Sequence, residues 1–319
     1  MMNNTVLNIY EKTKKDWDRL SSVRSSEETY ELHLDKIDSK KESIWKFSTG
    51  CPILNHIDLN SLDDIQREYV MGSQLLEFVL KTTKFEIDYV NKVANSLALE
   101  KYNFEIPAIL KSDALKIYTD EGYHAYFSKK ISDQIIDHFE IKDNLSPYIE
   151  SFFDKVDTIG ANYDKKFNFL SELSIVIVSE SMICQDISEE MKGIVYEPIR
   201  IMFKDHMHDE YFHANFFGTL FKILWPQLSD EEKEIMGFNL YDAINVFSEP
   251  RTDIYLYSLS KLGFSKELIS KCIKDTYDND EFKIKNAKKK MSTPLKLLNS
   301  CGVFEISTIR NKFEKRGFI

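Results

Sequence analysis

Glycine and proline, the residues that most often interrupt helices, are scarce in this sequence, with 10 and 7 copies in 319 residues. Most long segments carry apolar residues three and four positions apart, which is the spacing of an amphipathic helix and not of a strand. Hydrophobic residues make up 43% of the chain and include 22 Phe and 16 Tyr, enough for a sizeable core. The sequence therefore predicts an all-α globular fold.

Cysteine is rarer still, and no two cysteines form a CxxC pair. The four positions are far apart along the chain: Cys51, Cys184, Cys272 and Cys301. This spacing predicts neither a zinc site nor a disulfide framework. The chain also lacks a G-x-G-x-x-G fingerprint, so no bound flavin or nicotinamide is expected.

Basic residues are fewer than acidic residues, and long apolar runs are lacking as well. The formal net charge of −10 makes binding to phosphate backbones or anionic membranes unfavourable. Residues 1–20 have no apolar core of the signal-peptide kind, and no uninterrupted apolar run reaches the roughly 18 residues of a membrane span. We expect a cytoplasmic protein with no nucleic-acid and no membrane partner.

The few prolines predict where helices begin and end, because proline is tolerated in the first turn of a helix but not further along it. Three of them fall at expected boundaries: Pro147, Pro198 and Pro226. One long helix is expected from about Pro198 to Trp225. Ser229 and Glu232 have the spacing of a capping box and predict the start of the next helix.

Histidine is also rare, yet three of the seven histidines lie in one short stretch, DHMHDEYFHANFF, from Asp205 to Phe217. In a helix His206, Glu210 and His213 share a face, whereas His208 points to another face and is expected at the surface. The shared face continues with apolar residues: Ile199, Met202, Phe217, Leu220 and Leu224. Burying a carboxylate and two imidazoles on such a face is costly unless they are paired or bind a cation.

A second stretch, DEGYH, repeats the pattern D-E-x-x-H and places Glu121 and His124 on the apolar face of another helix. A lone histidine on such a face is more often a hydrogen-bonded core residue than a ligand, and two copies favour a ligand. Asp120 and Asp209 each precede the matching histidine by four residues, where a carboxylate can accept a hydrogen bond from the imidazole. Exposure on the neighbouring face is an equally good interpretation of these two aspartates.

Ferritin-like bundles bind two metal ions with Glu-x-x-His from each of two helices and one Glu from each of two others. Glu86 lies at the centre of a helical apolar stripe from Leu75 to Leu97, and Glu180 lies in the most apolar helical run of the chain. Three other glutamates compete for these places: Glu77, Glu100 and Glu172.

The full predicted ligand set alternates single glutamates with Glu-x-x-His pairs and adds His206 as a seventh ligand and third imidazole. Its members are Glu86, Glu121, His124, Glu180, His206, Glu210 and His213. Carboxylate and imidazole ligands without thiolate favour iron, with manganese possible, so we expect two Fe ions. We expect a single domain over residues 1–319, with a metal-binding bundle at about 70–226 and C-terminal helices at 227–319.

With these motifs the sequence resembles the AurF family of di-iron N-oxygenases, the p-aminobenzoate N-oxygenase-like proteins. The resemblance covers most of the chain, and its elements are FEIDYVN around Glu86, DEGYH, VSESM around Glu180, the H-x-x-x-D-E-x-x-H string from His206 to His213, and the C-terminal STPLKLLNSCG. It implies a ferritin-like helical bundle with flanking helices, a homodimer, and two irons reduced by an external electron donor. The implied reaction uses O2 to oxidise an amine nitrogen towards a hydroxylamine, nitroso or nitro product.

Other interpretations stay open. A ribonucleotide reductase small subunit shares the carboxylate and histidine alternation, but Ser128 stands where that family has its radical tyrosine. A ferroxidase or a manganese catalase is also possible, although the chain length and His206 count against both. The remaining alternative is a metal-free helical interaction protein with buried ionic networks.

Overall fold

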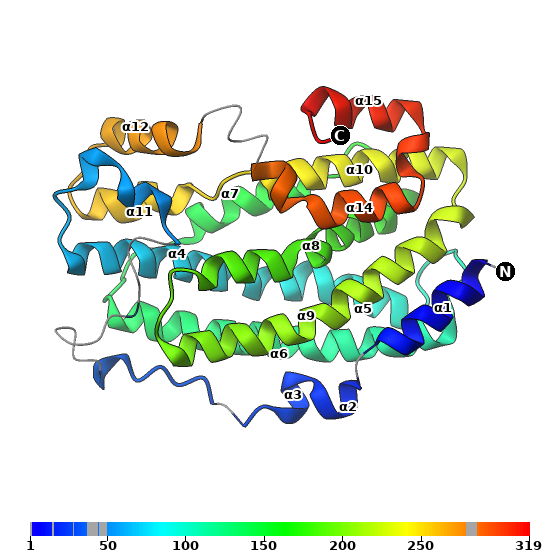
Figure 1. Ribbon diagram of the computed structural model, residues 1–319, viewed down its shortest axis with the longest axis horizontal. Coiled ribbons are helices and arrows are strands. Elements are labelled where there is room, and N and C mark those ends of the chain that lie inside the picture. Colours follow the sequence, from blue (N-terminus) through cyan, green and yellow to red (C-terminus); the bar gives the residue numbers. More distant parts are fainter. Residues whose placement is uncertain (1, 15, 28, 37–43, 45–49, 279–285) are drawn as a thin grey trace.

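The computed structural model describes residues 2–14, 16–27, 29–36, 44, 50–278 and 286–319, and within these ranges it contains helices and no strands. Figure 1 shows an elongated bundle with long, nearly parallel helix axes at its centre. The central helices are α4 (Asp64–Phe85), α5 (Asn91–Ala98), α6 (Ala108–His138), α8 (Asn168–Met191) and α9 (Glu197–Leu224). Since α4 and α5 pack on α6, α6 packs on α9 and α9 packs on α8, the expected all-α ferritin-like bundle is confirmed.

Local sequence signals explain where these helices begin. The Asp63 side chain accepts the backbone N–H of Gln66 and caps α4, which therefore starts a little before residue 70. Pro198 lies in the first turn of α9, as predicted. Ser229 and Glu232 form the predicted capping box at the start of α10 (Asp230–Ser248).

The first central helix is not a regular α-helix throughout. Between α4 and α5, residues Glu86–Val90 form a π turn in which the Asn91 N–H donates to the Glu86 carbonyl, five residues earlier. A stripe of regular three and four spacing does not predict this turn. Wide turns of this kind are frequent at functional sites.

Helix α8 is the most apolar central element. Together with its leading turn, Lys165–Met191, it is long and apolar enough by length and composition to cross a membrane, but 67% of the apolar window is buried inside the protein. Leu173, Val176 and Ile177 are fully buried between α9 and α10. Its composition is thus accounted for by its place at the centre of the core.

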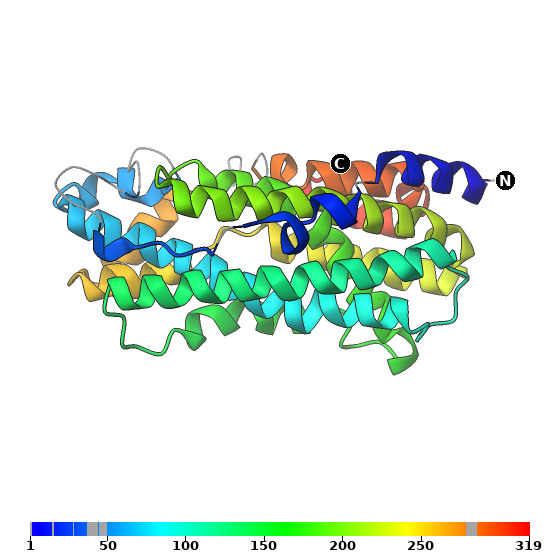
Figure 2. The same cartoon turned by 90° about the horizontal axis from the view of Figure 1, so that it is seen from below.

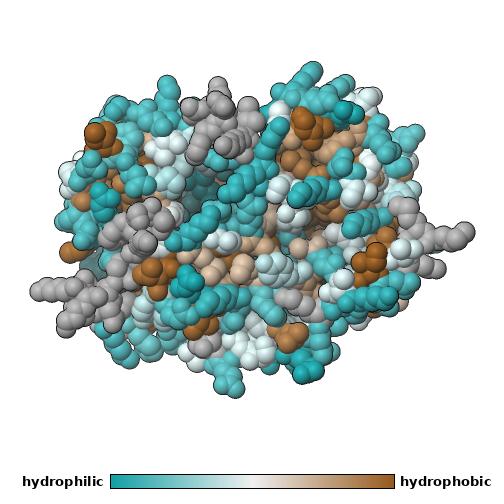
Figure 3. Space-filling view, viewed as in Figure 1, coloured by the Kyte–Doolittle hydropathy of each residue, from teal (hydrophilic) through white to brown (hydrophobic). Residues whose placement is uncertain are grey.

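The remaining helices cover the bundle. They are α1 (Met2–Thr13), α7 (Ser146–Asp157), α10, α11 (Asp253–Lys261), α12 (Lys266–Tyr277), α14 (Ser292–Ser300) and α15 (Ser307–Arg316). Helices α10 and α14 pack on α8, and α15 packs on α10, where Gly237 lets Ile309 approach closely. The face in Figure 3 is largely hydrophilic with scattered apolar residues, as expected for a buried apolar core.

Two short helices, α2 (Trp17–Leu20) and α3 (Ser22–Ser25), belong to a segment that runs along the outside of the central bundle (Figure 1). Figure 2 shows this segment between α6 and α9, and α3 contacts both helices. We call residues 17–26 the N-terminal strap. The division of the chain into a bundle and a C-terminal helical region within one domain stays a prediction.

Candidate metal centre

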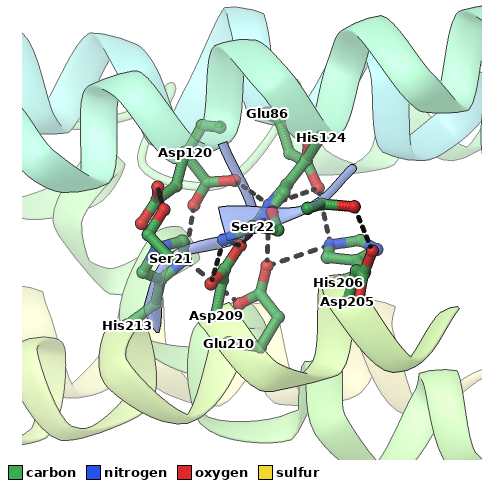
Figure 4. A network of polar contacts seen from close by, with 12 residues as sticks. Ser21, Ser22, Glu86, Asp120, His124, Asp205, His206, Asp209, Glu210 and His213 are labelled. Carbon is green, nitrogen blue, oxygen red and sulfur yellow. Dashed lines mark hydrogen bonds and ion pairs between the residues drawn. The ribbon is translucent and has the colours of Figure 1, made fainter. Parts of the chain in front are cut away.

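The structure brings together all seven residues of the predicted ligand set at the centre of the bundle. Glu86 comes from the π turn, and the others come from the middle of α6, α8 and α9: Glu121, His124, Glu180, His206, Glu210 and His213. The exposed fraction of each residue is 5% or less. Figure 4 shows side chains from opposite helices pointing toward one another across the bundle.

One half of the cluster consists of Glu86, His124, His206 and Glu210, whose ligand atoms lie within 4.8 Å of one another. His206 Nε2 is 3.1 Å from Glu86 Oε1 and 3.0 Å from Glu210 Oε1. His124 turns its Nδ1 to the same point, 3.3 Å from Glu210 Oε1. His206 and Glu210, which lie one turn apart in α9, thus face Glu86 of the π turn across the bundle.

The other half consists of Glu121, His124, Glu210 and His213, so His124 belongs to both groups, and Glu180 lies beside this one. His213 Nδ1 lies 3.0 Å from Glu121 Oε1, 3.3 Å from Glu210 Oε2 and 3.7 Å from Glu180 Oε2. Glu180 is therefore the terminal carboxylate of this half, as Glu86 is of the other.

Glu121 and Glu210 lie between the two halves. Glu210 directs Oε1 to His124 and His206 and Oε2 to His213. Glu121 directs Oε2 to His124 at 3.2 Å and Oε1 to His213. Two carboxylates that each offer one oxygen to either side are the arrangement that bridges a pair of cations.

Several carboxylate oxygens and imidazole nitrogens of the cluster are buried without a well-aligned hydrogen bond. Within the described residues, these atoms are Glu86 Oε2, Glu121 Oε1, Glu180 Oε2, His206 Nδ1, Glu210 Oε2 and His213 Nδ1. Leaving such atoms unsatisfied costs about 1–3 kcal/mol each. Four carboxylates and inward-facing imidazole nitrogens fit two divalent cations in both charge and donor type.

Burial and the close approach of like charges also shift the pKa values of the cluster residues. Burial raises the pKa of Glu86 to about 7, with the charge of Glu121 adding to it, and burial raises the pKa of Glu180 well above its usual value. Burial lowers the pKa of the His213 imidazole, but the charges of Glu121 and Glu210 outweigh it and hold that pKa well above its usual value. Protons thus occupy the positions where cations would bind, and metal binding would displace them.

Asp120 and Asp209 are buried next to the cluster, so the interpretation of them as exposed acids is wrong. Their expected pairing within each helix is also wrong, because the contacts cross between helices. His124 Nε2 lies 3.1 Å from Asp209 Oδ2, and His213 Nε2 lies 3.2 Å from Asp120 Oδ2. Each aspartate accepts the outer N–H of the opposite histidine, which leaves the inner Nδ1 free to bind a cation.

The competing acidic residues lie outside the cluster. Glu77 is buried but pairs with Lys81 at 2.7 Å, Glu172 pairs with Lys92 at 2.8 Å, and Glu100 pairs with Lys111 at 2.8 Å. Of the three histidines between Asp205 and Phe217, His208 is exposed, as expected.

Two features could not be predicted from the sequence. The first is the N-terminal strap, which contacts Asp120 and Asp209 through residues far away in the chain. The second is a smaller group of His56, Asp58 and Cys272, whose ligand atoms also lie within 4.8 Å of one another. There, Lys271 already pairs with Asp58, so a cation would have to displace the ammonium group.

A family model described as p-aminobenzoate N-oxygenase AurF matches residues 10–293 of the chain, a range that contains every residue of the cluster and the strap. The chain belongs to the AurF family. No curated protein is significantly similar to it in sequence. The AurF family is a di-iron family with a helical fold, and the buried carboxylate and histidine cluster of this member is able to hold metal ions.

Proposed function

We propose that this AurF-family protein is a di-iron N-oxygenase that uses O2 to oxygenate the nitrogen of a small-molecule amine. The observation that carries the proposal is the convergence of four buried carboxylates and three imidazoles at the bundle centre, where several carboxylate oxygens lack a hydrogen-bond donor. The imidazoles offer too few N–H groups to satisfy every oxygen of four carboxylates, whereas two cations would satisfy them. The family match supports an oxygenase activity.

The protein residues hold and separate two ions in this proposal. Glu121 and Glu210 would bridge the pair, Glu86 with His124 and His206 would complete one half, and Glu180 with His213 would complete the other. Two reduced irons supply the electrons and the binding site for dioxygen, which amino-acid side chains cannot supply.

The cluster is shielded from bulk water. Glu86 and Glu180 are 5% and 4% exposed, and the residues of both Glu-x-x-His pairs are 1% exposed or less. Exclusion of bulk water strengthens the electrostatic contacts inside the site and protects a reactive oxygen species from side reactions.

The remaining partners are also part of the proposal. The chain has no G-x-G-x-x-G fingerprint and no cysteine cluster, so the electrons are expected from a separate reductase. A homodimer and a cytoplasmic location stay predictions, and manganese remains an alternative metal. A ribonucleotide reductase-like role is disfavoured because position 128 is a buried serine with no phenol to oxidise.

The decisive experiment is single-turnover oxygenation. The iron-loaded protein is reduced, exposed to ¹⁸O-labelled dioxygen and given 4-aminobenzoate or another arylamine, and the products are analysed by mass spectrometry. Labelled oxygen on nitrogen supports the proposal. Disproportionation of peroxide or deposition of ferric mineral, without an N-oxygenated product from any amine offered, would instead support the catalase or ferroxidase alternative.

Matched variants tie the activity to the cluster. Glu180→Ala is expected to abolish N-oxygenation together with iron at its half of the site. Glu172→Ala, on the same helix but paired with Lys92 and away from the cluster, is expected to retain both.

A further inference from the structure

The two outer aspartates are themselves held by neighbouring residues of the N-terminal strap. Asp120 accepts hydrogen bonds from Trp17 Nε1 at 2.8 Å and from Ser21 Oγ at 2.5 Å. Asp209 accepts from the Ser22 backbone N–H at 3.1 Å and from Ser22 Oγ at 2.5 Å. Figure 4 shows this part of the strap between the two central helices.

These contacts are buried and closely packed. Ser21 and Ser22 are 3% and 4% exposed. Asp120 and Asp209 are themselves 0% and 2% exposed, although a small open pocket of ≈ 10 Å³ lies between them and the strap. Bulk water therefore has little access to the carboxylates, and the strap donors determine how each carboxylate is oriented.

Further contacts fix the strap along its length. Ser26 and Tyr30 both donate to Asp205 on α9, each at 2.9 Å. Before the strap, Tyr10 donates to Asp113 on α6 at 2.9 Å. The chain is thus held to α6 before the two serines and to α9 after them. These two attachments limit how far the serines can shift.

We propose that Ser21 and Ser22 are positioning residues for the metal centre, which rests on the proposed function above. Through Asp209, Ser22 holds the His124 ring with Nδ1 toward the cluster, and through Asp120, Ser21 does the same for His213. Each serine touches one aspartate and acts on the histidine of the other helix. The strap and the metal pair consequently stabilise each other.

The first test measures ferrous iron binding without oxygen, by competition with a chelator, in the full-length protein. Removal of a partner that contacts a ligating histidine typically weakens metal binding about 10–100-fold. Because the serines lie one contact further out, Ser21→Ala and Ser22→Ala should each weaken one of the two irons by about the lower end of that range, 10-fold. Ser25→Ala is the matched control, because Ser25 is exposed and donates within the strap, to Ser21 O at 2.9 Å. It should bind both irons as the wild type does.

A double-mutant cycle separates positioning from a general loss of stability. Ser22→Ala should have no further effect on iron binding in a His124→Ala background and its full effect in a His213→Ala background. Conversely, iron loading of the wild type should slow hydrogen exchange at the Ser22 amide. Equal effects of Ser22→Ala in both backgrounds, unchanged iron affinity in both serine variants, or an equal loss in Ser25→Ala would each overturn the proposal.

These outcomes are independent of turnover. A wild type that binds two irons and oxygenates no amine would refute the proposed reaction and leave the role of the strap intact. Serine variants that bind iron normally while the wild type oxygenates amines would refute the role of the strap alone.

Discussion

Replacing Glu180 with methionine should stabilise the metal-free protein and destabilise the metal-loaded one. Glu180 is 4% exposed, and its Oε2 has no hydrogen-bond partner. Its Oε1 accepts from Ser179, which can still donate to the Val176 carbonyl after the change. Methionine has a similar length, favours helices and adds no polar atom.

The size of the effect follows from the unpaired carboxyl oxygen. Removing a buried polar atom without a partner should raise the free energy of unfolding of the metal-free protein by about 1–3 kcal/mol. With an unfolding entropy of about 2.1 cal/mol/K per residue, each kcal/mol corresponds to about 1.5 °C for a chain of this length, so Tm should rise by about 2–5 °C.

When iron is bound, Glu180→Met should lower the stability of the protein instead of raising it. Iron at 100 times its Kd stabilises the wild type by about 2.7 kcal/mol, and the variant loses this contribution for the half of the site that depends on Glu180. The assay is thermal unfolding of both proteins after chelation and after ferrous iron loading. Glu172→Met, on the same helix, is the control and should show no iron-dependent difference.

A lower Tm of metal-free Glu180→Met would refute this reasoning, because it would mean that the carboxylate stabilises the fold by itself. An equal gain from iron in the wild type and the variant would also refute it, because Glu180 would then lie outside the metal centre.

Three further predictions concern packing and pH. A Cβ at position 237 would lie 2.1 Å from Ile309 Cδ1, so Gly237→Ala should cost about 1–3 kcal/mol of stability, measured by urea unfolding. A Cβ at position 122 would meet nothing within 4 Å, so Gly122→Ala should stabilise α6 by about 0.5–1 kcal/mol without a change in iron content. Burial lowers the pKa values of His124 and His213, but the surrounding carboxylates hold both well above the usual value, so the metal-free imidazoles keep protons at neutral pH. These raised pKa values stabilise the metal-free protein below about pH 6.5, and this contribution is lost as the pH rises through the folded values. Iron binding should then release protons and tighten from pH 6 to pH 8, as calorimetry in buffers of different ionisation enthalpy would show, and affinity independent of pH would contradict this.

Helical periodicity was enough to predict which residues meet at the bundle centre. Glu210 and His213 share an apolar face of α9, and such a face can only turn inward. The same argument on three other helices led to Glu86, Glu121 and Glu180. Each prediction used spacing along one helix, which the chain geometry fixes locally.

Contacts between elements could not be predicted in this way. The crossed pairs of Asp120 with His213 and Asp209 with His124 depend on how α6 and α9 lie side by side. The strap contacts join Ser22 to a residue 187 positions away, which no local pattern encodes. The π turn at Glu86 was also missed, because the burial pattern around it fits a regular helix equally well.

A crystal structure of the iron-loaded protein, with anomalous diffraction data collected on both sides of the iron edge, tests most directly whether the cluster holds two irons. We expect two anomalous peaks at the bundle centre, both in contact with Glu121 and Glu210, one beside His124 and His206 and the other beside His213 and Glu180. No peak there, or iron at His56, Asp58 and Cys272 alone, would contradict it.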